Sequence, residues 1–495
     1  MRQFRPVPRL RGAGRALHQH RPPAGKGKGL SRVREDRGVE RKKRAAKRRG
    51  GEPAGQRRGG KPAGKRRGGK PAAGDRSPRS YFEYSFLLIL TMAILALGVV
   101  MVFSASWAQG FFDEGSGAGN PDSYRYLKRE LIFAGIGIVS MLTLARFDYR
   151  KLRRAAPLLM WVSIFLLMLV FIPGVGVTQN GARSWIGSSG FMTFQPSELA
   201  KLAAVIYIAA RLYEKPRLLG RLEKLAGPVL GLPLVALLLI AAEPDLGTAS
   251  ILFTAIVMML VVSGVRMRVI AGIGAGTVVA AMASLMIFSH QRERVASYMD
   301  SLLHFWDISF IRSWSEAQDA GFQLVQSLVA MGSGGLLGLG LGESIQKFNY
   351  LPEAHTDMIL SIIGEELGLA GVLGVVLGFA ALAYIGFRIA LKCNDRFGKF
   401  LAAGITSLLV GQAAINVSAA TGILPLTGIP LPLISYGGSS LVVILSAVGI
   451  LLNISVNKRG RVGTARFKTI EGGNRGRRDG RPPGSRSRAR ERAYG

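Results

Sequence analysis

Charged residues gather at two places in this sequence, with types and spacing that can serve proton transfer or form the polar wall of a cavity. The first group is Glu353, His355 and Asp357, which stand within five consecutive positions. A carboxylate at such a place can take a proton from an attacking hydroxyl group, and His355 is either a second proton-transfer group or a loop histidine with local hydrogen bonds. If a helix begins near Thr356, the unpaired N–H groups of its first turn favour the ionised form of Asp357.

The second group lies earlier in the chain. Glu198 and Lys201 are three residues apart, so they share one face of a helix about one turn inside an apolar segment. Charges are costly there and should face the interior of a helix bundle. Asp245, in a short turn further along, is a third carboxylate that can join Lys201. These residues form either the polar wall of a cavity or a structural ion pair that fixes helix packing.

The distribution of charge indicates which part of the chain positions these groups. Of the net charge of +35, residues 1–80 contribute 27 Lys and Arg against 5 Asp and Glu, and residues 457–495 contribute 13 against 3. The remaining body, residues 81–456, carries 25 basic and 22 acidic residues and is nearly neutral. This pattern excludes a uniformly basic nucleic-acid-binding domain and predicts an apolar body between two basic tails.

Both basic tails are predicted to be disordered. The N-terminal tail contains three successive nine-residue units that begin at Arg48, Arg57 and Arg66 and are rich in Gly and Pro. Such segments cannot bury enough apolar surface to offset the entropy of ordering. Anionic membrane lipids are the expected partners of the tails, and nucleic acid is not. The single cysteine, Cys393, excludes an intrachain disulfide, and the five histidines are too scattered for a metal cage.

Ten apolar stretches of the body are long enough to cross about 30 Å of hydrocarbon. Gly and Pro interrupt several of them, which neighbouring helices tolerate. The fold class that this pattern predicts is an all-α polytopic membrane protein with ten transmembrane helices. The predicted spans are 84–106, 130–146, 155–172, 196–213, 227–243, 246–264, 268–289, 357–388, 399–422 and 434–456.

The loops between the spans predict the orientation of the chain. One set of loops is basic, whereas the 173–195 loop has a single basic residue and the 423–433 loop has none. By the positive-inside rule, the basic loops and both termini are cytoplasmic. The opposite, outward side then includes the 290–356 loop, which is too long for an idle connection and is therefore a candidate functional element.

Four segments of the body carry a further pattern. They are, in chain order, NGARSWI with FQPSELAKLA (180–203), EPDLGTA (243–249), the segment that includes YLPEAHTDMILSIIGEELGLAG (321–371), and ATGILPLTGIPLPLISYGGSS (420–440). Together they resemble the SEDS family of cell-wall glycosyltransferases, which includes FtsW, RodA and SpoVE. The resemblance covers the whole body. Ala354 resembles the division-type FtsW members, and Glu243 stands where the family more often has glutamine.

The resemblance implies an enzyme that polymerises lipid II into glycan strands at the outer face of the bacterial cytoplasmic membrane, for the septal wall of dividing cells. It also implies that Asp357 is the catalytic base. No outward loop is large enough to form a transpeptidase domain, so a separate enzyme must cross-link the strands. The resemblance implies that this partner is a class B penicillin-binding protein, together with other division proteins. Small residues on the eighth span, such as Gly374 and Gly378, allow close approach of a partner helix.

The donor's pyrophosphate leaving group needs cations or backbone dipoles nearby. Arg183 and Lys347 are the outward basic residues inside the matched segments, and we expect them to contact the pyrophosphate. The carboxylates of Asp357 and Glu353 would also allow a divalent cation, Mg or Mn, although no ligand cluster demands one.

The remaining predicted contacts come from helix geometry and from irregular backbone. At about 100° per residue, Glu365 shares the face of Asp357, whereas Glu366 does not. Prolines break the 420–440 segment, which makes Ser435 and Tyr436 candidate contacts. The predicted substrate-binding residues are Arg183, Lys347, Glu353, His355, Glu198, Lys201, Asp245, Ser435 and Tyr436.

Other functions remain open at this point. One is an elongation polymerase of the RodA type. Another is a lipid II flippase, which should have internal repeats and polar groups reachable from both sides, whereas the matched polar residues here gather on the outward side. A third is a scaffold with an inert body, which an outward carboxylate such as Asp357 disfavours.

Overall fold

The computed structural model describes residues 78–108, 123–179, 182–187, 193–214, 226–287 and 320–457, together with Arg292, Val295, Ala296, Tyr298 and Met299. The two basic tails lie outside these described residues, apart from the positions that adjoin the body. The first helix begins at Pro78, slightly before the predicted start of the body.

A helix stands at each of the ten positions that hydropathy predicts. Among the described residues, six of these helices, α1, α4, α8, α13, α14 and α15, are long and apolar enough to cross a membrane by length and composition. A π-helical turn, Ala226–Leu230, leads into the short α7. The predicted all-α class is confirmed. The ten helices are α1 Pro78–Trp107, α3 Arg125–Arg146, α4 Arg150–Val170, α5 Pro196–Glu214, α7 Gly231–Ala242, α8 Leu246–Ser263, α9 Met267–Ile287, α13 Ile359–Lys392, α14 Arg396–Ala420 and α15 Gly438–Val456.

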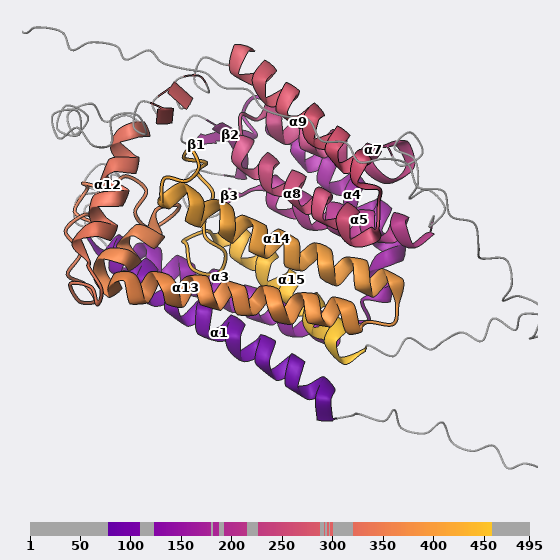
Figure 1. Ribbon diagram of the computed structural model, residues 1–495, viewed down its shortest axis with the longest axis horizontal. Helices are drawn as coiled ribbons and strands as arrows, with labels where there is room; N and C mark the ends of the chain where they lie inside the picture. Colours follow the sequence, from indigo (N-terminus) through magenta and orange to yellow (C-terminus); the bar gives the residue numbers. More distant parts are fainter. Residues whose placement is uncertain are drawn as a thin grey trace, which may run out of the picture. The chain divides into compact units, whose positions relative to one another are not determined.

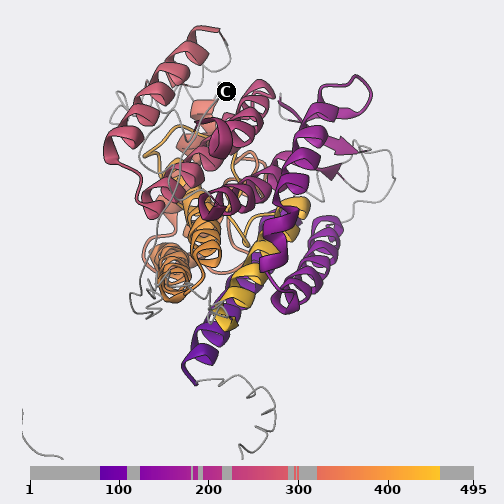
Figure 2. The same ribbon diagram turned by 90° about the vertical axis from the view of Figure 1, so that its right-hand side faces the viewer.

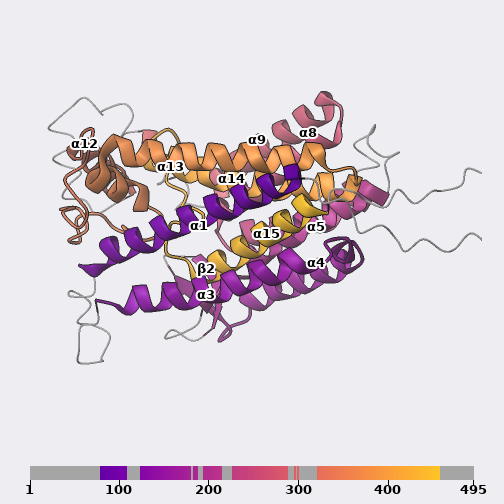
Figure 3. The same cartoon turned by 90° about the horizontal axis from the view of Figure 1, so that it is seen from below.

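The interior of the bundle is built from α5, α14 and α15. α15 packs along α3, and α14 packs against α5, α8 and α13 (Figures 1 and 3). In the view turned by 90°, α15, the yellow helix, runs beside purple helices from the start of the body (Figure 2). Every residue from Ala200 to Ala210 of α5 is buried, as expected of a helix that is almost entirely apolar. α13 instead exposes Leu369, Leu373 and Leu377, as a helix against hydrocarbon does.

The segment between α4 and α5, predicted to be a loop, forms a small sheet. Strands β1 Gly176–Gln179, β2 Ala182–Gly187 and β3 Thr193–Phe194 pair antiparallel in the order β1-β2-β3. The register places Arg183 opposite Thr178, next to an irregularity between Val177 and Thr178. The pairing folds β2 back over the end of α4, and this decides where the Arg183 side chain points.

The predicted eighth span, 357–388, requires two corrections. α13 begins only at Ile359, so Asp357 precedes the cap residue Met358 and does not lie in the first helical turn. Inside α13, Gly368 has φ 67° and ψ −165°, a left-handed backbone conformation that interrupts the helix. A further helix that was not predicted, α12 Ala320–Ser333, packs against α13.

The glycine-rich segment 334–342, which follows α12, pairs with the backbone groups that this interruption leaves free. A Cβ atom at Gly338 would lie 2.1 Å from the carbonyl oxygen of Glu366, and one at Gly368 would lie 2.4 Å from the Gly338 nitrogen. Only glycine permits this approach of two main chains. The main-chain hydrogen bonds are Leu339 N to Glu365 O (2.9 Å), Gly340 N to Glu366 O (3.0 Å), Leu369 N to Gly335 O (2.9 Å) and Ala370 N to Leu336 O (3.1 Å).

Candidate active site

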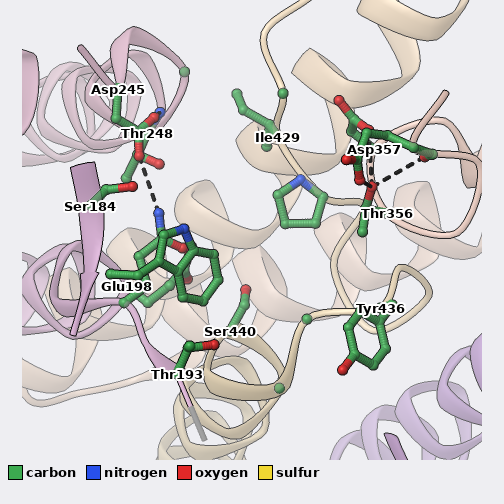
Figure 4. Close-up of a pocket in the computed structure, with 18 of the residues that line it drawn as sticks. Ser184, Thr193, Glu198, Asp245, Thr248, Thr356, Asp357, Ile429, Tyr436 and Ser440 are labelled. Atoms are coloured by element: carbon green, nitrogen blue, oxygen red, sulfur yellow. Dashed lines mark hydrogen bonds between the residues drawn. The ribbon is translucent and has the colours of Figure 1, made fainter. Parts of the chain in front are cut away.

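A cavity of about 560 Å³ opens where several helices begin. Residues at the N-terminal ends of α3, α5, α8 and α15 line it, together with the segment just before α13 (Figure 4). Helix N-termini carry unpaired N–H groups and a partial positive charge, so this convergence favours a negatively charged ligand. The charged residues that line the cavity are Arg125, Arg129, Glu198, Asp245, Glu353 and Asp357.

Asp357 is held at the cavity by its main chain and by a neighbouring hydroxyl group. The amide nitrogen Nδ2 of Asn416 donates to the carbonyl oxygens of both Asp357 (2.8 Å) and Ile429 (2.7 Å), which ties the two segments together. The hydroxyl group of Thr356 lies 2.6 Å from Glu353 Oε2 and 3.1 Å from Asp357 Oδ1. Two carboxylates therefore share one hydroxyl neighbour, with the Asp357 carboxylate at the cavity wall.

A second acidic group forms the opposite side of the cavity. In Figure 4, Asp245, Ser184 and Glu198 lie on one side of Ile429, and Asp357 lies on the other. Asp245 caps α8, accepting from Thr248 N (2.9 Å), and also accepts from Gln195 Nε2 (3.1 Å). Burial raises the pKa of the Asp245 carboxyl, and the hydrogen bonds from Thr248 partly offset this effect.

Lys201 pairs with Glu198, as the spacing predicts, but does not form the direct ion pair with Asp245 that the sequence allowed. Its Nζ lies 2.8 Å from Glu198 Oε1 and 3.0 Å from Gln412 Oε1, and both ends of the pair are buried. Lys201 does not line the cavity, whereas Glu198 does. The pair thus has both predicted roles, because the lysine fixes helix packing and the glutamate forms cavity wall.

Aromatic rings form the part of the cavity next to Asp357. His355 and Tyr436, both predicted contacts, line it together with Tyr126 of α3, which sequence reasoning missed. Burial lowers the pKa of His355 to about 4, and the nearby Glu353 opposes this only in part. The buried imidazole is therefore a weak base, and the role of His355 as a second proton-transfer group stays a prediction.

Sequence reasoning also missed two cations, Arg125 and Arg129, which line the cavity from the first turns of α3. Arg129 hydrogen-bonds the side chain of Tyr436. The sequence prediction considers only basic residues inside the matched segments, whereas Arg125 and Arg129 precede the predicted span 130–146. Their signal in the sequence is a pair of basic residues at the predicted outward end of a span, which runs against the positive-inside rule.

Two predicted contacts point away from the cavity. Arg183 donates from Nε to the carbonyl oxygen of Gly176 (3.2 Å) and from Nη2 to the carbonyl oxygen of Ile172 (2.7 Å). The side chain therefore caps the segment after α4. The hydroxyl group of Ser435 accepts from Leu431 N (2.7 Å) and holds the irregular backbone before α15. Neither residue lines the cavity.

Lys347 is also outside the cavity, and its side chain is 2% exposed. Its Nζ lies 3.2 Å from Glu366 Oε1 and donates to the Gly342 carbonyl oxygen. Glu365 does not share the site of Asp357 either, because it accepts from the Ser344 hydroxyl (2.5 Å) and from the Ile345 backbone (3.0 Å). The prediction that Glu365 shares a helix face with Asp357 is wrong because α13 begins only at Ile359, so Asp357 does not belong to the helix that carries Glu365.

The described part of the chain offers few side chains that could bind the divalent cation that the sequence allows. No group of three His, Cys, Asp or Glu side chains in the described part of the chain gathers closely enough to hold a metal ion. Asp357 and Glu353 meet at the Thr356 hydroxyl and would supply two carboxylates, so further oxygen ligands would have to come from substrate phosphate or water.

Known proteins similar to this chain share its body. A family model described as "Cell cycle protein", for FtsW, RodA and SpoVE, matches residues 84–460. Stage V sporulation protein E of Bacillus subtilis is 41% identical over 371 residues, covering 74% of this chain and 96% of that protein. A probable peptidoglycan glycosyltransferase FtsW of Geobacter metallireducens is 40% identical over 376 residues, covering 76% of this chain and 95% of that protein.

Solved structures resemble the fold. A structure that describes coordination of polymerization and crosslinking by a peptidoglycan synthase complex matches with a TM-score of 0.57 and 29% identity, covering 75% of this chain and 97% of that one. The crystal structure of the rod shape determining protein RodA of Thermus thermophilus matches with a TM-score of 0.53 and 28% identity, covering 76% and 97%. The chain therefore belongs to the FtsW, RodA and SpoVE family of multi-pass membrane proteins, the SEDS family.

Proposed function

We propose that this protein is a peptidoglycan glycosyltransferase that polymerises lipid II, a lipid-linked disaccharide-peptide, with Asp357 as general base. The observation that carries the proposal is the Asp357 carboxylate in a cavity that also contains Arg125 and Arg129. The reaction needs both kinds of group, a base for the attacking hydroxyl and cations for the leaving pyrophosphate. The peptidoglycan glycosyltransferase named among its relatives supports the same class of reaction.

In the proposed reaction, Asp357 takes the proton of an acceptor sugar hydroxyl while the oxygen of that hydroxyl attacks the anomeric carbon of the donor. A glycosidic C–O bond forms, and the bond from the anomeric carbon to the pyrophosphate oxygen breaks, its electron pair leaving with the pyrophosphate. Arg125, Arg129 and the helix N-termini stabilise the negative charge that develops there. The protonated Asp357 then returns its proton to water.

The other predicted residues divide into two groups in this proposal. Glu353, His355 and Tyr436 contact substrate near Asp357, and Glu198 and Asp245 contact it on the opposite wall. The remaining four, Arg183, Lys201, Lys347 and Ser435, act on substrate only through the structure that they hold.

We further propose that both termini are cytoplasmic, that the cavity faces outward, and that the strands serve the septal wall. The charge of the loops supports the orientation, and the FtsW relatives support the division role. Flipping of lipid II is the weaker alternative, because the charged residues of the cavity gather at one end of the bundle and a flippase requires access from both ends.

The test of the function is polymerisation of purified lipid II by the purified chain, with and without a class B transpeptidase from the same organism. Asp357→Asn should lower glycan-strand formation at least about a hundredfold, because a general base contributes roughly that much, while the melting temperature is retained. Glu343→Gln, a change at an exposed carboxylate outside the cavity, is the matched control and should keep its activity. Polymerisation by Asp357→Asn at a near wild-type rate would refute the assignment.

A transpeptidase partner is expected to pack laterally on α13. A Cβ atom at Gly374 would meet nothing within 4 Å, whereas one at Gly386 would lie 2.3 Å from Thr406 of α14, so only the former position is open to a second helix. Gly374→Leu should therefore weaken co-purification of the transpeptidase. Gly272→Leu, at an equally open position on α9, should not. Equal recovery with both variants would exclude this face of α13.

A further inference from the structure

Three aromatic rings from separate segments meet at one wall of the cavity. The centroid of Tyr126 lies 4.6 Å from that of His355 and 5.3 Å from that of Tyr436, and the last two rings are 5.5 Å apart. The Tyr436 backbone N–H also donates to the His355 carbonyl oxygen (3.0 Å), which fixes the two segments to each other. We call Tyr126, His355 and Tyr436 the aromatic cluster.

One polar atom of the aromatic cluster has no partner within the described residues. His355 is 7% exposed, and its Nδ1 makes no hydrogen bond there, although the residue lines the cavity. A buried polar atom left unpaired destabilises the fold, so its persistence calls for an explanation such as a ligand. A neutral imidazole offers either a donor or an acceptor at this nitrogen.

The aromatic cluster lies between the two kinds of group that glycosyl transfer needs. His355 stands two residues before Asp357 in the chain, and Tyr436 is hydrogen-bonded to Arg129. In the proposed reaction the donor sugar must also lie between these two kinds of group. Its anomeric carbon stands between the attacking oxygen, held at the base, and the leaving pyrophosphate, held at the cations.

We propose that the aromatic cluster is the subsite for the pyranose ring of the donor, the sugar whose anomeric carbon carries the pyrophosphate. This inference rests on the proposed function. The negative faces of the aromatic rings attract the polarised C–H groups of a pyranose. Nδ1 of His355 pairs with a hydroxyl or acetamido group of the same sugar. His355 thereby contributes to binding and orientation rather than to proton transfer.

The test compares two ligands that share the lipid pyrophosphate and differ in the disaccharide-peptide group, which only lipid II carries. Binding of lipid II and of undecaprenyl pyrophosphate is measured with the full chain carrying Asp357→Asn, so that no turnover occurs. Adding Tyr126→Leu, which removes a ring, should weaken lipid II binding roughly tenfold, the equivalent of about 1.4 kcal/mol. Adding His355→Phe, which keeps a ring but removes Nδ1, should also weaken it. Neither change should alter binding of undecaprenyl pyrophosphate.

The matched control is Tyr124→Leu, a change at an exposed tyrosine that stacks on Phe103 outside the cavity. Lipid II binding that is unchanged in both cluster variants would overturn the subsite. Equal weakening of both ligands would also overturn it, because the cluster would then act on the pyrophosphate or on folding. Failure of the chain without these substitutions to polymerise lipid II would instead count against the proposed function, and this is measured separately.

Discussion

The buried ion pair between Lys347 and Glu366 allows a sharp test of what Lys347 does. The sequence predicts a contact to pyrophosphate, whereas the side chain is buried 3.2 Å from Glu366, whose own side chain is 0% exposed. The Ser104 hydroxyl lies 2.6 and 2.8 Å from the two oxygens of Glu366, so the carboxylate joins α1, α13 and the segment between residue 342 and α13 that carries Lys347. We expect Lys347 to hold these elements in position through the ion pair and not to contact substrate.

The perturbation is Lys347→Met, which leaves the Glu366 carboxylate buried with the Ser104 hydroxyl as its only side-chain partner among the described residues. Removing one member of a buried pair costs about 3–5 kcal/mol. For a helical body of this size, that loss corresponds to a fall in melting temperature of roughly 5–15 °C. The double variant Lys347→Met with Glu366→Gln removes both charges and keeps an acceptor for Ser104, so most of the lost stability should return.

The assay is thermal unfolding in detergent together with lipid II polymerisation for the two single variants and the double variant. If the role is structural, stability and activity recover together in the double variant. A double variant as unstable as Lys347→Met would refute the ion-pair reasoning. A double variant that is stable but inactive would show that Lys347 acts on substrate, as its motif predicts.

Two further predictions concern the turn before α8 and the interruption of α13. Neither carboxylate oxygen of the buried Glu243 has a hydrogen bond within the described residues. A buried carboxyl group without a partner costs stability, so Glu243→Gln, which removes the charge and keeps the size, should raise the melting temperature. Thermal unfolding of the two proteins in detergent tests this, and a lower melting temperature of the variant would contradict it. Gly368→Ala should lower the melting temperature and activity, because its Cβ would lie 2.4 Å from the Gly338 nitrogen at a positive φ; Gly374→Ala, in the regular part of the same helix, should be neutral or slightly stabilising.

The positions of the helices were predictable from the sequence, because the length of an apolar stretch needed to cross hydrocarbon does not depend on its neighbours. The sequence also indicated that one cavity would contain Asp357, Glu198 and Asp245, because each of them lies at the end of a predicted span on the same side of the membrane. The directions of Arg183 and Lys347 were not predictable in the same way. β-Pairing turns Arg183 over α4, and the docking of residues 334–342 buries Lys347, and both depend on contacts between segments.

The interruption of α13 has a consequence for how the protein is made. Unpaired main-chain groups are costly in a bilayer, and the groups around Gly368 are paired by residues 335–340. α13 therefore cannot settle in the membrane as an independent helix. The smallest element that can be inserted with its backbone satisfied at this place extends from the glycine-rich segment through α13, residues 334–392. Fragments or fusion junctions meant to follow biogenesis of this protein should keep that segment and α13 together.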